Sequence, residues 1–316
     1  MKKSEFSFIG DIATLFGTLP HHGFEAIGDD CTVLDMGDDA LVMTTDMLVE
    51  DVHFLRGASS AEEVGRKSLM VNLSDVAAMG ATPIATLLSL SLPESAQGEW
   101  SEAFMRGYYE ACKESGVALV GGDTTASRDR ITINIVAIGK APKSNIKRRS
   151  AAKVGDVIMV TGKLGASAAG LRDVIDGRLT TRNAKIHLMP EARVKEGIWL
   201  GAQREVHAMM DISDGIASDL HHILRASGVG AWVELRSLPL SPQLHTICER
   251  EGWSATELAT SAGEDYELLL TAPEEIAQEV DFPLYPIGKI TEGESEIEWY
   301  DGGKKVTLKT KGFTHF

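Results

Sequence analysis

The sequence predicts a protein of the α/β (or α+β) class with two domains. Its 316 residues are more than most single domains contain. Segments with the patterns of strands and of helices are mixed in both halves of the chain. A basic and polar segment at residues 140–153 separates the halves and includes three consecutive basic residues at 147–149. Because linkers between domains often have this character, we predict an N-terminal domain over residues 1–149 and a C-terminal domain over residues 150–316.

In the N-terminal domain, hydrophobic patterns place strands and helices. Short apolar runs rich in β-branched residues predict strands at residues 41–45, 86–92, 117–120 and 131–138. Apolar residues at helical spacing predict helices at residues 61–79 and 99–115. Asn72 and Asp75 lie three positions apart in the first helix, so their side chains share one face. The strand at 117–120 is expected to run into a turn at Gly121-Gly122.

In the C-terminal domain, the same criteria predict both kinds of element. Strands are expected at residues 156–160, 231–235, 266–271 and 285–290. Helices are expected at residues 166–175 and 215–226, the first of them after a turn at 162–165. The local patterns do not determine the order of the strands.

Composition and charge narrow the class of protein. Hydrophobic residues make up 43% and charged residues 24% of the chain, which is ordinary for a soluble globular enzyme. No apolar run approaches the roughly 20 residues that span a bilayer, and residues 1–6 do not lead into the apolar stretch of a secretory signal. The net charge of −15 disfavours nucleic acid as a partner. Cys31, Cys112 and Cys248 are isolated, which excludes a cysteine zinc site by spacing and favours a reducing cytoplasm.

Four short segments in the first half carry carboxylates among Gly, Ser or Thr instead of Lys or Arg. They are Gly28-Asp29-Asp30, Thr44-Thr45-Asp46, Asn72-Leu73-Ser74-Asp75 and Gly121-Gly122-Asp123-Thr124-Thr125. Two bare carboxylates about 4 Å apart repel by about 4 kcal/mol at a protein-like dielectric. If the segments converge, a hard divalent cation such as Mg²⁺ is the natural source of positive charge. The leading hypothesis is an oxygen-ligand metal cluster for phosphate chemistry, with main candidate ligands Asp30, Asp46, Asp75 and Asp123 and further oxygens from Thr44 and Thr45.

Each of these acids also has a structural alternative, because Asp commonly caps a helix or closes a turn. The recurrence of one pattern in four segments favours the metal site over four separate caps. Asp29 stays unassigned, since adjacent side chains generally point apart. Asp211 and Asp214 flank Ser213 just before the helix at 215–226. Free backbone amides at such a helix start suit a phosphate or a metal-bound phosphate, and plain N-capping fits the local sequence equally well.

Three further residues are candidates for ligand contacts. His53 follows Asp46 by seven positions, and it is either part of the same site or a structural histidine. Arg149 suits a bidentate clamp on a nucleotide phosphate, or it belongs to a solvated linker. Glu264 would bind a ligand's amino group or ring nitrogen if it points into a cleft, and it is a turn residue if it points outward. The chain has no P-loop, dinucleotide-binding or protein-kinase motif, so any ATP site has another architecture.

Taken in order, these segments resemble the thiamine-monophosphate kinase family over nearly the whole chain. The matching segments are Glu5-Phe6-Ser7, Ile27-Gly28-Asp29-Asp30, Thr45-Asp46, His53-Phe54, residues 72–81, Gly121-Gly122-Asp123-Thr124-Thr125, Val160-Thr161-Gly162, Asp211-Ile212-Ser213-Asp214-Gly215, residues 263–268, Lys311-Gly312-Phe313 and His315-Phe316. Residues 72–81 and 263–268 are specific to that family. The Gly-Asp-Asp and Gly-Gly-Asp elements are shared with the wider aminoimidazole ribonucleotide synthetase (PurM-like) superfamily.

The resemblance implies an enzyme that uses ATP and Mg²⁺ to convert thiamine monophosphate into thiamine diphosphate. It implies a PurM-like two-domain architecture, in which an N-terminal mixed-sheet domain binds ATP and several Mg²⁺ ions and forms a homodimer. The C-terminal α/β domain would complete the site. By motif position, the metal ligands would be Asp30, Thr44, Thr45, Asp46, Asp75, Asp123, Asp211 and Asp214. The ATP contacts would be Gly122, Asp123, Arg149 and Ser213.

The thiamine phosphate contacts implied by the resemblance are His53, Glu264 and Thr310. Thr310 stands where the family often has a Trp that packs on the substrate ring, so this chain departs from the family there. Phe313 is the alternative for that stacking role.

The predicted mechanism is direct in-line transfer without a phosphoenzyme. The acceptor phosphate monoester has a second pKa of about 6, so it is mostly ionised at neutral pH and needs no general base. Two alternatives stay open at this point. One is another ATP-using synthetase of the PurM-like superfamily, and the other is a non-catalytic regulator that binds phosphate or metal on the same scaffold.

Overall fold

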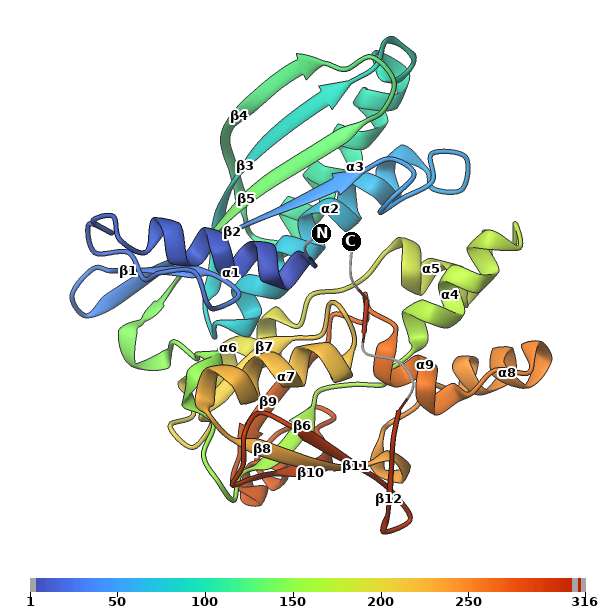
Figure 1. Ribbon diagram of the computed structural model, residues 1–316. Helices are drawn as coiled ribbons and strands as arrows, with labels where there is room; N and C mark the ends of the chain where they lie inside the picture. Colours follow the sequence, from blue (N-terminus) through green and yellow to red (C-terminus); the bar gives the residue numbers. More distant parts are fainter. Residues whose placement is uncertain (1–3, 309–311, 314–316) are drawn as a thin grey trace.

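The computed structural model describes residues 4–308 together with 312 and 313, and its strands form two sheets, one in each half of the chain (Figure 1). The N-terminal sheet contains, in spatial order, β1 (Thr32–Asp35), β2 (Asp39–Val49), β5 (Thr132–Pro142), β3 (Thr82–Leu92) and β4 (Ala118–Ala126). The C-terminal sheet contains, in spatial order, β12 (Lys304–Val306), β11 (Ile297–Asp301), β8 (Gly230–Glu234), β10 (Tyr285–Thr291), β6 (Val157–Val160), β9 (Leu268–Ala272) and β7 (Ala208–Asp211). Both sheets are mixed, because β3–β4 and β8–β11 pair in parallel beside antiparallel neighbours. The predicted class is confirmed.

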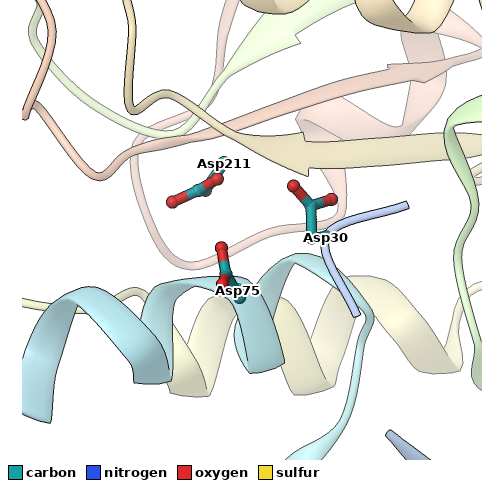
Figure 2. Close-up of side chains that lie close together, drawn as sticks. All are labelled: Asp30, Asp75 and Asp211. Atoms are coloured by element: carbon teal, nitrogen blue, oxygen red, sulfur yellow. The ribbon is translucent and has the colours of Figure 1, made fainter. Parts of the chain in front are cut away.

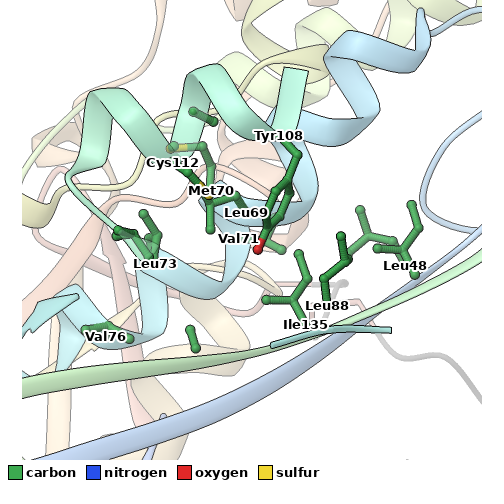
Figure 3. Close-up of a cluster of buried hydrophobic side chains, with 14 of the residues drawn as sticks. Leu48, Leu69, Met70, Val71, Leu73, Val76, Leu88, Tyr108, Cys112 and Ile135 are labelled. Carbon is green, nitrogen blue, oxygen red and sulfur yellow. The ribbon is translucent and has the colours of Figure 1, made fainter. Parts of the chain in front are cut away.

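Two helices, α2 (Ala61–Ala78) and α3 (Glu99–Ser115), cover one face of the N-terminal sheet. Ser60 and Glu63 form a capping box that fixes where α2 begins. The two helices approach closely at Gly107, where a Cβ atom would overlap the backbone of Glu62. Figure 3 shows the core between the layers, with Tyr108 of α3 above apolar side chains of α2 and of the strands. Among the described residues of this domain, no helix covers the opposite face of the sheet (Figure 1).

The C-terminal sheet packs against α7 (Ile216–Ser227) and its neighbours in a second core. The other helices of this half are α4 (Ala166–Ile175), α5 (Arg182–Leu188), α6 (Val194–Ala202), α8 (Pro242–Glu251) and α9 (Ala255–Ser261). A third apolar cluster joins Ala77 and Ala78 of α2 to Leu200 of α6 and to Met209 of β7. Helix α2 is therefore packed into both halves of the molecule, which fixes its position relative to the C-terminal strands.

Several predicted elements are confirmed with small differences at their ends. The helices expected at 99–115 and 166–175 have those bounds in α3 and α4, and the helix expected at 61–79 ends one residue earlier. The strand expected at 41–45 is longer, because β2 continues through Asp46 to Val49 along its antiparallel partner β5. Helix α1 (Glu5–Phe16) was not predicted. It contains no buried residue, so it carries little of the periodic signal on which the predictions rested.

The turn expected at Gly121-Gly122 is wrong, because both glycines lie inside β4. Strand β4 pairs with β3 at the edge of the sheet, with a register shift between Thr86 and Leu87. Gly122 has φ of 152°, and a Cβ atom there would overlap the Leu88 carbonyl oxygen. The glycines thus allow a close approach between strands, which the sequence alone does not distinguish from a turn.

No helix that the structure describes is both long and apolar enough to cross a membrane.

Candidate active site

Three carboxylates from distant parts of the chain meet beside α2. Asp30 comes from the segment before β1, Asp75 from the last turns of α2, and Asp211 from the end of β7. Each contributes an oxygen atom, and these oxygens all lie within 4.8 Å of one another. Figure 2 shows the three side chains gathered around a common space. The acids predicted to converge from these three positions therefore do so.

Thr44 and Asp46 of β2 extend this acid cluster. Side chains alternate along a strand, so both residues face α2. The Thr44 hydroxyl donates to Asp75 Oδ2 at 2.5 Å, and the Asp46 backbone amide donates to Asn72 Oδ1 at 3.0 Å. Asn72 and Asp75 thus share the helix face that their spacing predicted, and together they attach β2 to α2.

Burial and mutual repulsion make these acids difficult to ionise in the absence of a cation. Burial, followed by the charge of Asp30, raises the pKa of Asp211 to about 8. Burial, followed by Asp30 and Asp214, raises the pKa of Asp46 to about 6. Burial also raises the pKa of Asp75 well above its ordinary range. At neutral pH the cluster needs added positive charge if all of its carboxylates are to be ionised.

The residues of the cluster fit a magnesium ion. Their donors are all oxygen atoms, the type that hard divalent cations prefer. Asp30 Oδ2 is buried and has no hydrogen-bond partner among the described atoms, whereas buried polar atoms are nearly always paired. A cation between the three carboxylates would satisfy this oxygen.

Arg149 supplies positive charge that the local sequence around the acids does not reveal. Its Nη2 atom donates to Asp30 Oδ1 at 2.6 Å, and its backbone amide donates to Asp29 Oδ1 at 2.7 Å. The premise that the acids lack basic neighbours is therefore wrong for Asp30. The Arg149 side chain is 19% exposed, which contradicts the solvated-linker alternative, and its buried Nε has no partner among the described atoms. The Asp29 side chain, by accepting from the Arg149 backbone amide, anchors the segment that carries Arg149.

The two basic residues before Arg149 have other partners. Lys147 Nζ donates to the Gln203 carbonyl oxygen at 2.6 Å, and Arg148 Nε donates to Glu25 at 2.9 Å. These contacts hold the connection between the two halves of the chain, and they leave Arg149 as the residue of the run that lies at the acid cluster.

A cleft of about 1050 Å³ opens beside the cluster and is lined by both halves of the chain. Asp46, Asp75 and Asp211 contribute to its wall, and so do Ser213 and Asp214 at the start of α7. His53 also lines the cleft, with its Nδ1 accepting a hydrogen bond from the Val49 amide at 3.0 Å. These predicted site residues thus share one cavity.

Glu264 lies on the wall of the same cleft, so the outward-pointing alternative is not what the structure shows. Its carboxylate lies 2.9 Å from Lys67 Nζ and 3.2 Å from His187 Nδ1. Phe313 also lines the cleft. Thr310, the other predicted stacking position, lies outside the described residues.

Thr45, Gly122 and Asp123 are not brought to this cluster within one chain. Across the sheet, Asp123 of β4 pairs with Ser89 of β3, Ser89 pairs with Asn134 of β5, and Asn134 pairs with Met47 of β2. Directly paired residues point to the same face, and Met47 points away from α2, so Asp123 lies on the sheet face opposite Asp46. Three strand spacings also separate them by about 14 Å. Thr45 shares this outer face, where its hydroxyl accepts from Asn134 Nδ2 at 2.8 Å.

Three functional candidates were not identified from the sequence. Lys67 is buried on the cleft face of α2, and its only sequence signal is its place one turn before Val71 and two turns before Asp75. Asp219 is buried in the first turn of α7, where its Oδ2 accepts from the Asp214 amide at 3.3 Å. His187, in α5, has no local motif that marks it.

The comparisons with known proteins identify the family. The family model for the N-terminal domain of AIR synthase related proteins matches residues 28–141, and the model for their C-terminal domain matches residues 153–301. Thiamine-monophosphate kinase of Buchnera aphidicola subsp. Acyrthosiphon pisum is 36% identical over 100% of both chains. Thiamine-monophosphate kinase of Escherichia coli K12 is 38% identical over 92% of this chain and 91% of its own.

Solved structures give the same result. The structure described as AaThiL complexed with AMPPCP and TMP has a TM-score of 0.88 and 34% identity, over 100% of this chain and 99% of its own. Thiamine monophosphate kinase from Aquifex aeolicus has a TM-score of 0.82 and 33% identity, over 97% and 99% of the two chains. The hydrogenase maturation protein HypE in complex with ATP, at 19% identity, shares the fold. The resemblance seen in the sequence and the PurM-like two-domain fold are confirmed, and the chain belongs to the thiamine-monophosphate kinase family of AIR synthase related proteins.

Proposed function

We propose that this kinase phosphorylates thiamine monophosphate to thiamine diphosphate with ATP, by direct in-line transfer. The observation that carries the proposal is the buried cluster of Asp30, Asp75 and Asp211, which opens onto a cleft between the two halves of the chain. The substrate is supported by relatives named thiamine-monophosphate kinase and by the similar structure described as a complex with AMPPCP and TMP.

Residues in the cluster and on the adjoining cleft wall would hold Mg²⁺ ions. They are Asp30, Thr44, Asp46, Asp75 and Asp211 of the cluster and Asp214 of the wall. When bound, the ions would neutralise the two phosphate groups and hold them in alignment for transfer. Arg149 adds a fixed positive charge beside Asp30 and is the proposed contact for the ATP phosphates. Ser213 is proposed as a second ATP contact at the start of α7.

The phosphate of thiamine monophosphate is the proposed acceptor. It is mostly dianionic at neutral pH because its second pKa is about 6, so the chain needs no general base. His53 and Glu264, which line the cleft, are the proposed contacts to thiamine monophosphate, and Phe313, one of the aromatic residues of the cleft wall, is the proposed contact to its rings. Since transfer is direct, we expect no phosphorylated protein after incubation with ATP alone.

We further propose that two copies of the chain associate through the outer face of the N-terminal sheet. This face exposes apolar side chains, with Met47 53% and Leu87 36% exposed. Strand β4 is exposed along its whole length at the edge of the sheet. Exposed apolar surface of this kind is typical of an interface.

The dimer would also explain where Thr45, Gly122 and Asp123 act. All three lie on or at the edge of the outer face, away from the cluster of their own chain. We propose that Asp123 and Gly122 of one copy complete the metal and ATP site beside Thr45 of the second copy. Mixed dimers test this: an Asp123→Asn chain and an Asp211→Asn chain, each inactive alone, should regain activity when co-expressed. Failure of mixed dimers to regain activity would contradict the cross-dimer assignment.

The decisive experiment for the activity is a Mg²⁺-dependent assay of thiamine diphosphate formation from thiamine monophosphate and ATP. We expect product only when all three components are present. ATP binding without ATP consumption would instead favour a non-catalytic regulator. The proposed cytoplasmic location fits the three cysteines, which are all buried and free.

A further inference from the structure

Lys67 is a buried cation on the wall of the cleft that has no role so far. It lies on the same face of α2 as Val64, Val71 and Asp75, and all four line the cleft. Lys67 precedes Asp75 by eight residues, so the two lie about 12 Å apart along the helix axis at 1.5 Å per residue. A ligand with its phosphate at the acid cluster therefore presents its other end two helical turns away, beside Lys67.

The ammonium group of Lys67 is fully engaged with two partners. Its Nζ lies 2.9 Å from Glu264 Oε1 and 3.1 Å from Glu264 Oε2, and it donates to the His53 carbonyl oxygen at 3.3 Å. The Lys67 side chain is only 4% exposed, whereas that of Glu264 is 29% exposed. A ligand in the cleft can thus reach the carboxylate, while the lysine lies behind it.

The backbone around Glu264 holds the carboxylate in one place. Glu264 has φ of 62°, a conformation that L residues rarely adopt, and its amide donates to the Ser213 carbonyl oxygen at 2.8 Å. Gly263 has no room for a side chain, because a Cβ atom would overlap that same oxygen. The following residue, Asp265, accepts from the Gly165 amide at 2.6 Å. The loop is therefore anchored on both sides of Glu264.

The charges around Glu264 favour an ionised carboxylate. Burial by itself raises its pKa, but the charge of the adjacent Lys67 is the largest opposing effect, and the pKa is lowered overall. Burial, followed by the nearby Lys67, lowers the pKa of His187 to about 4, so this imidazole is neutral at physiological pH. Of the two side chains that contact Glu264, Lys67 and His187, Lys67 is thus the one that carries a positive charge.

We propose that Lys67 is a positioning residue that holds the carboxylate of Glu264 as an ionised acceptor for the amine-bearing, cationic ring portion of the substrate. The inference rests on the proposed function, since it assigns the ring end of thiamine monophosphate to Glu264. Without Lys67, the carboxylate would lose two short contacts, and it would take up a proton or turn toward solvent. Either change removes a fixed negative acceptor two turns from the acid cluster, where the ATP phosphates are not expected.

Steady-state kinetics with Lys67→Met test the proposal. We expect KM for thiamine monophosphate to rise at least tenfold, while KM for ATP and kcat change less than threefold. Lys185→Met is the matched control. Lys185 of α5 also pairs with a glutamate, Glu63 of α2, but it does not line the cleft. It should leave all three constants within twofold of the wild type.

A double-mutant cycle separates positioning from a general structural role. If Lys67 acts through Glu264, adding Lys67→Met to Glu264→Gln should change KM less than twofold beyond the single Glu264→Gln variant. This comparison stays available if Lys67→Met alone fails to fold, because the double variant leaves no unpaired buried charge. Unchanged KM in Lys67→Met, or the same rise in both backgrounds, would overturn the inference while the proposed function stands. A wild-type protein that forms no thiamine diphosphate would instead overturn the proposed function.

Discussion

Replacing Asp211 with Asn should stabilise the metal-free protein, because it removes charge repulsion within the acid cluster. The same change should abolish turnover. The ligand oxygens of Asp30, Asp75 and Asp211 lie within 4.8 Å of one another. At an effective dielectric constant of 20, two unit charges at that distance repel by about 3 kcal/mol. Asp211 forms two such pairs when all three acids are ionised. The Asn variant keeps the size of the side chain and removes both repulsions.

The pH dependence follows from the raised pKa of Asp211, which burial and then Asp30 bring to about 8. Between its ordinary pKa of 3.8 and about 8, this group binds more protons in the folded than in the unfolded protein. Stability of the metal-free protein therefore falls as the pH rises through that window. The Asn variant lacks this contribution, so its stability should fall less.

Thermal unfolding in EDTA at pH 6 and at pH 8.5 measures the effect. The wild-type melting temperature should be lower at pH 8.5, and Mg²⁺ should restore it. The Asp211→Asn variant should melt above the wild type at pH 8.5 in EDTA, respond weakly to Mg²⁺, and show no turnover. A metal-free wild type that is equally stable at both pH values would refute the reasoning, as would a full Mg²⁺ response in the variant.

A control variant distinguishes this effect from the loss of any buried acid. Asp156 is also buried, but it lies 2.9 Å from His207 and does not line the cleft. Removing its charge breaks a favourable pair, so Asp156→Asn should lower stability and keep the Mg²⁺ response of the wild type.

Four further substitutions have expected outcomes. Asp46→Asn and Asp75→Asn should each abolish turnover in the thiamine diphosphate assay while circular dichroism stays native; near-normal turnover in both would contradict the metal-cluster argument. Arg149→Met should raise KM for ATP at least tenfold in the same assay, because it removes the guanidinium beside the cluster, and an unchanged KM would exclude a phosphate contact. Gly107→Ala should lower the free energy of unfolding by about 1–3 kcal/mol in urea titrations, because the added methyl group overlaps the Glu62 backbone. Gly57→Ala, where a Cβ atom meets nothing within 4 Å, is its control and should show a loss below about 0.5 kcal/mol.

Local sequence predicted those parts of the site that depend on spacing within one element. The shared helix face of Asn72 and Asp75 followed from their separation of three residues, and the structure places both against β2. The start of α7 after Ser213 and Asp214 was recognisable in the same way. These features need only the helical repeat, which is a property of the chain itself.

The remaining features depend on contacts between distant segments. Asp123 was grouped with Asp46 because both lie among Gly, Ser or Thr instead of basic residues, but the strand order β2-β5-β3-β4 puts them about 14 Å apart, on opposite faces. The Asp30–Arg149 pair joins residues 119 positions apart. The Lys67–Glu264 pair joins residues 197 positions apart. No local pattern in a single sequence reports such pairs.

The position of α2 explains how the chain maintains a cluster of buried like charges. Carboxylates that repel one another would separate if the elements that carry them were free to move. Ala77 and Ala78, two and three residues after Asp75, are fully buried against α6 and the C-terminal strands, and Gly197 of α6 leaves no space for a side chain against the Ala77 carbonyl group. Any shift of α2 that relieved the repulsion would also open this contact between the two halves. The packing therefore holds the acids close together before a cation arrives, which is the preorganisation that phosphoryl transfer requires.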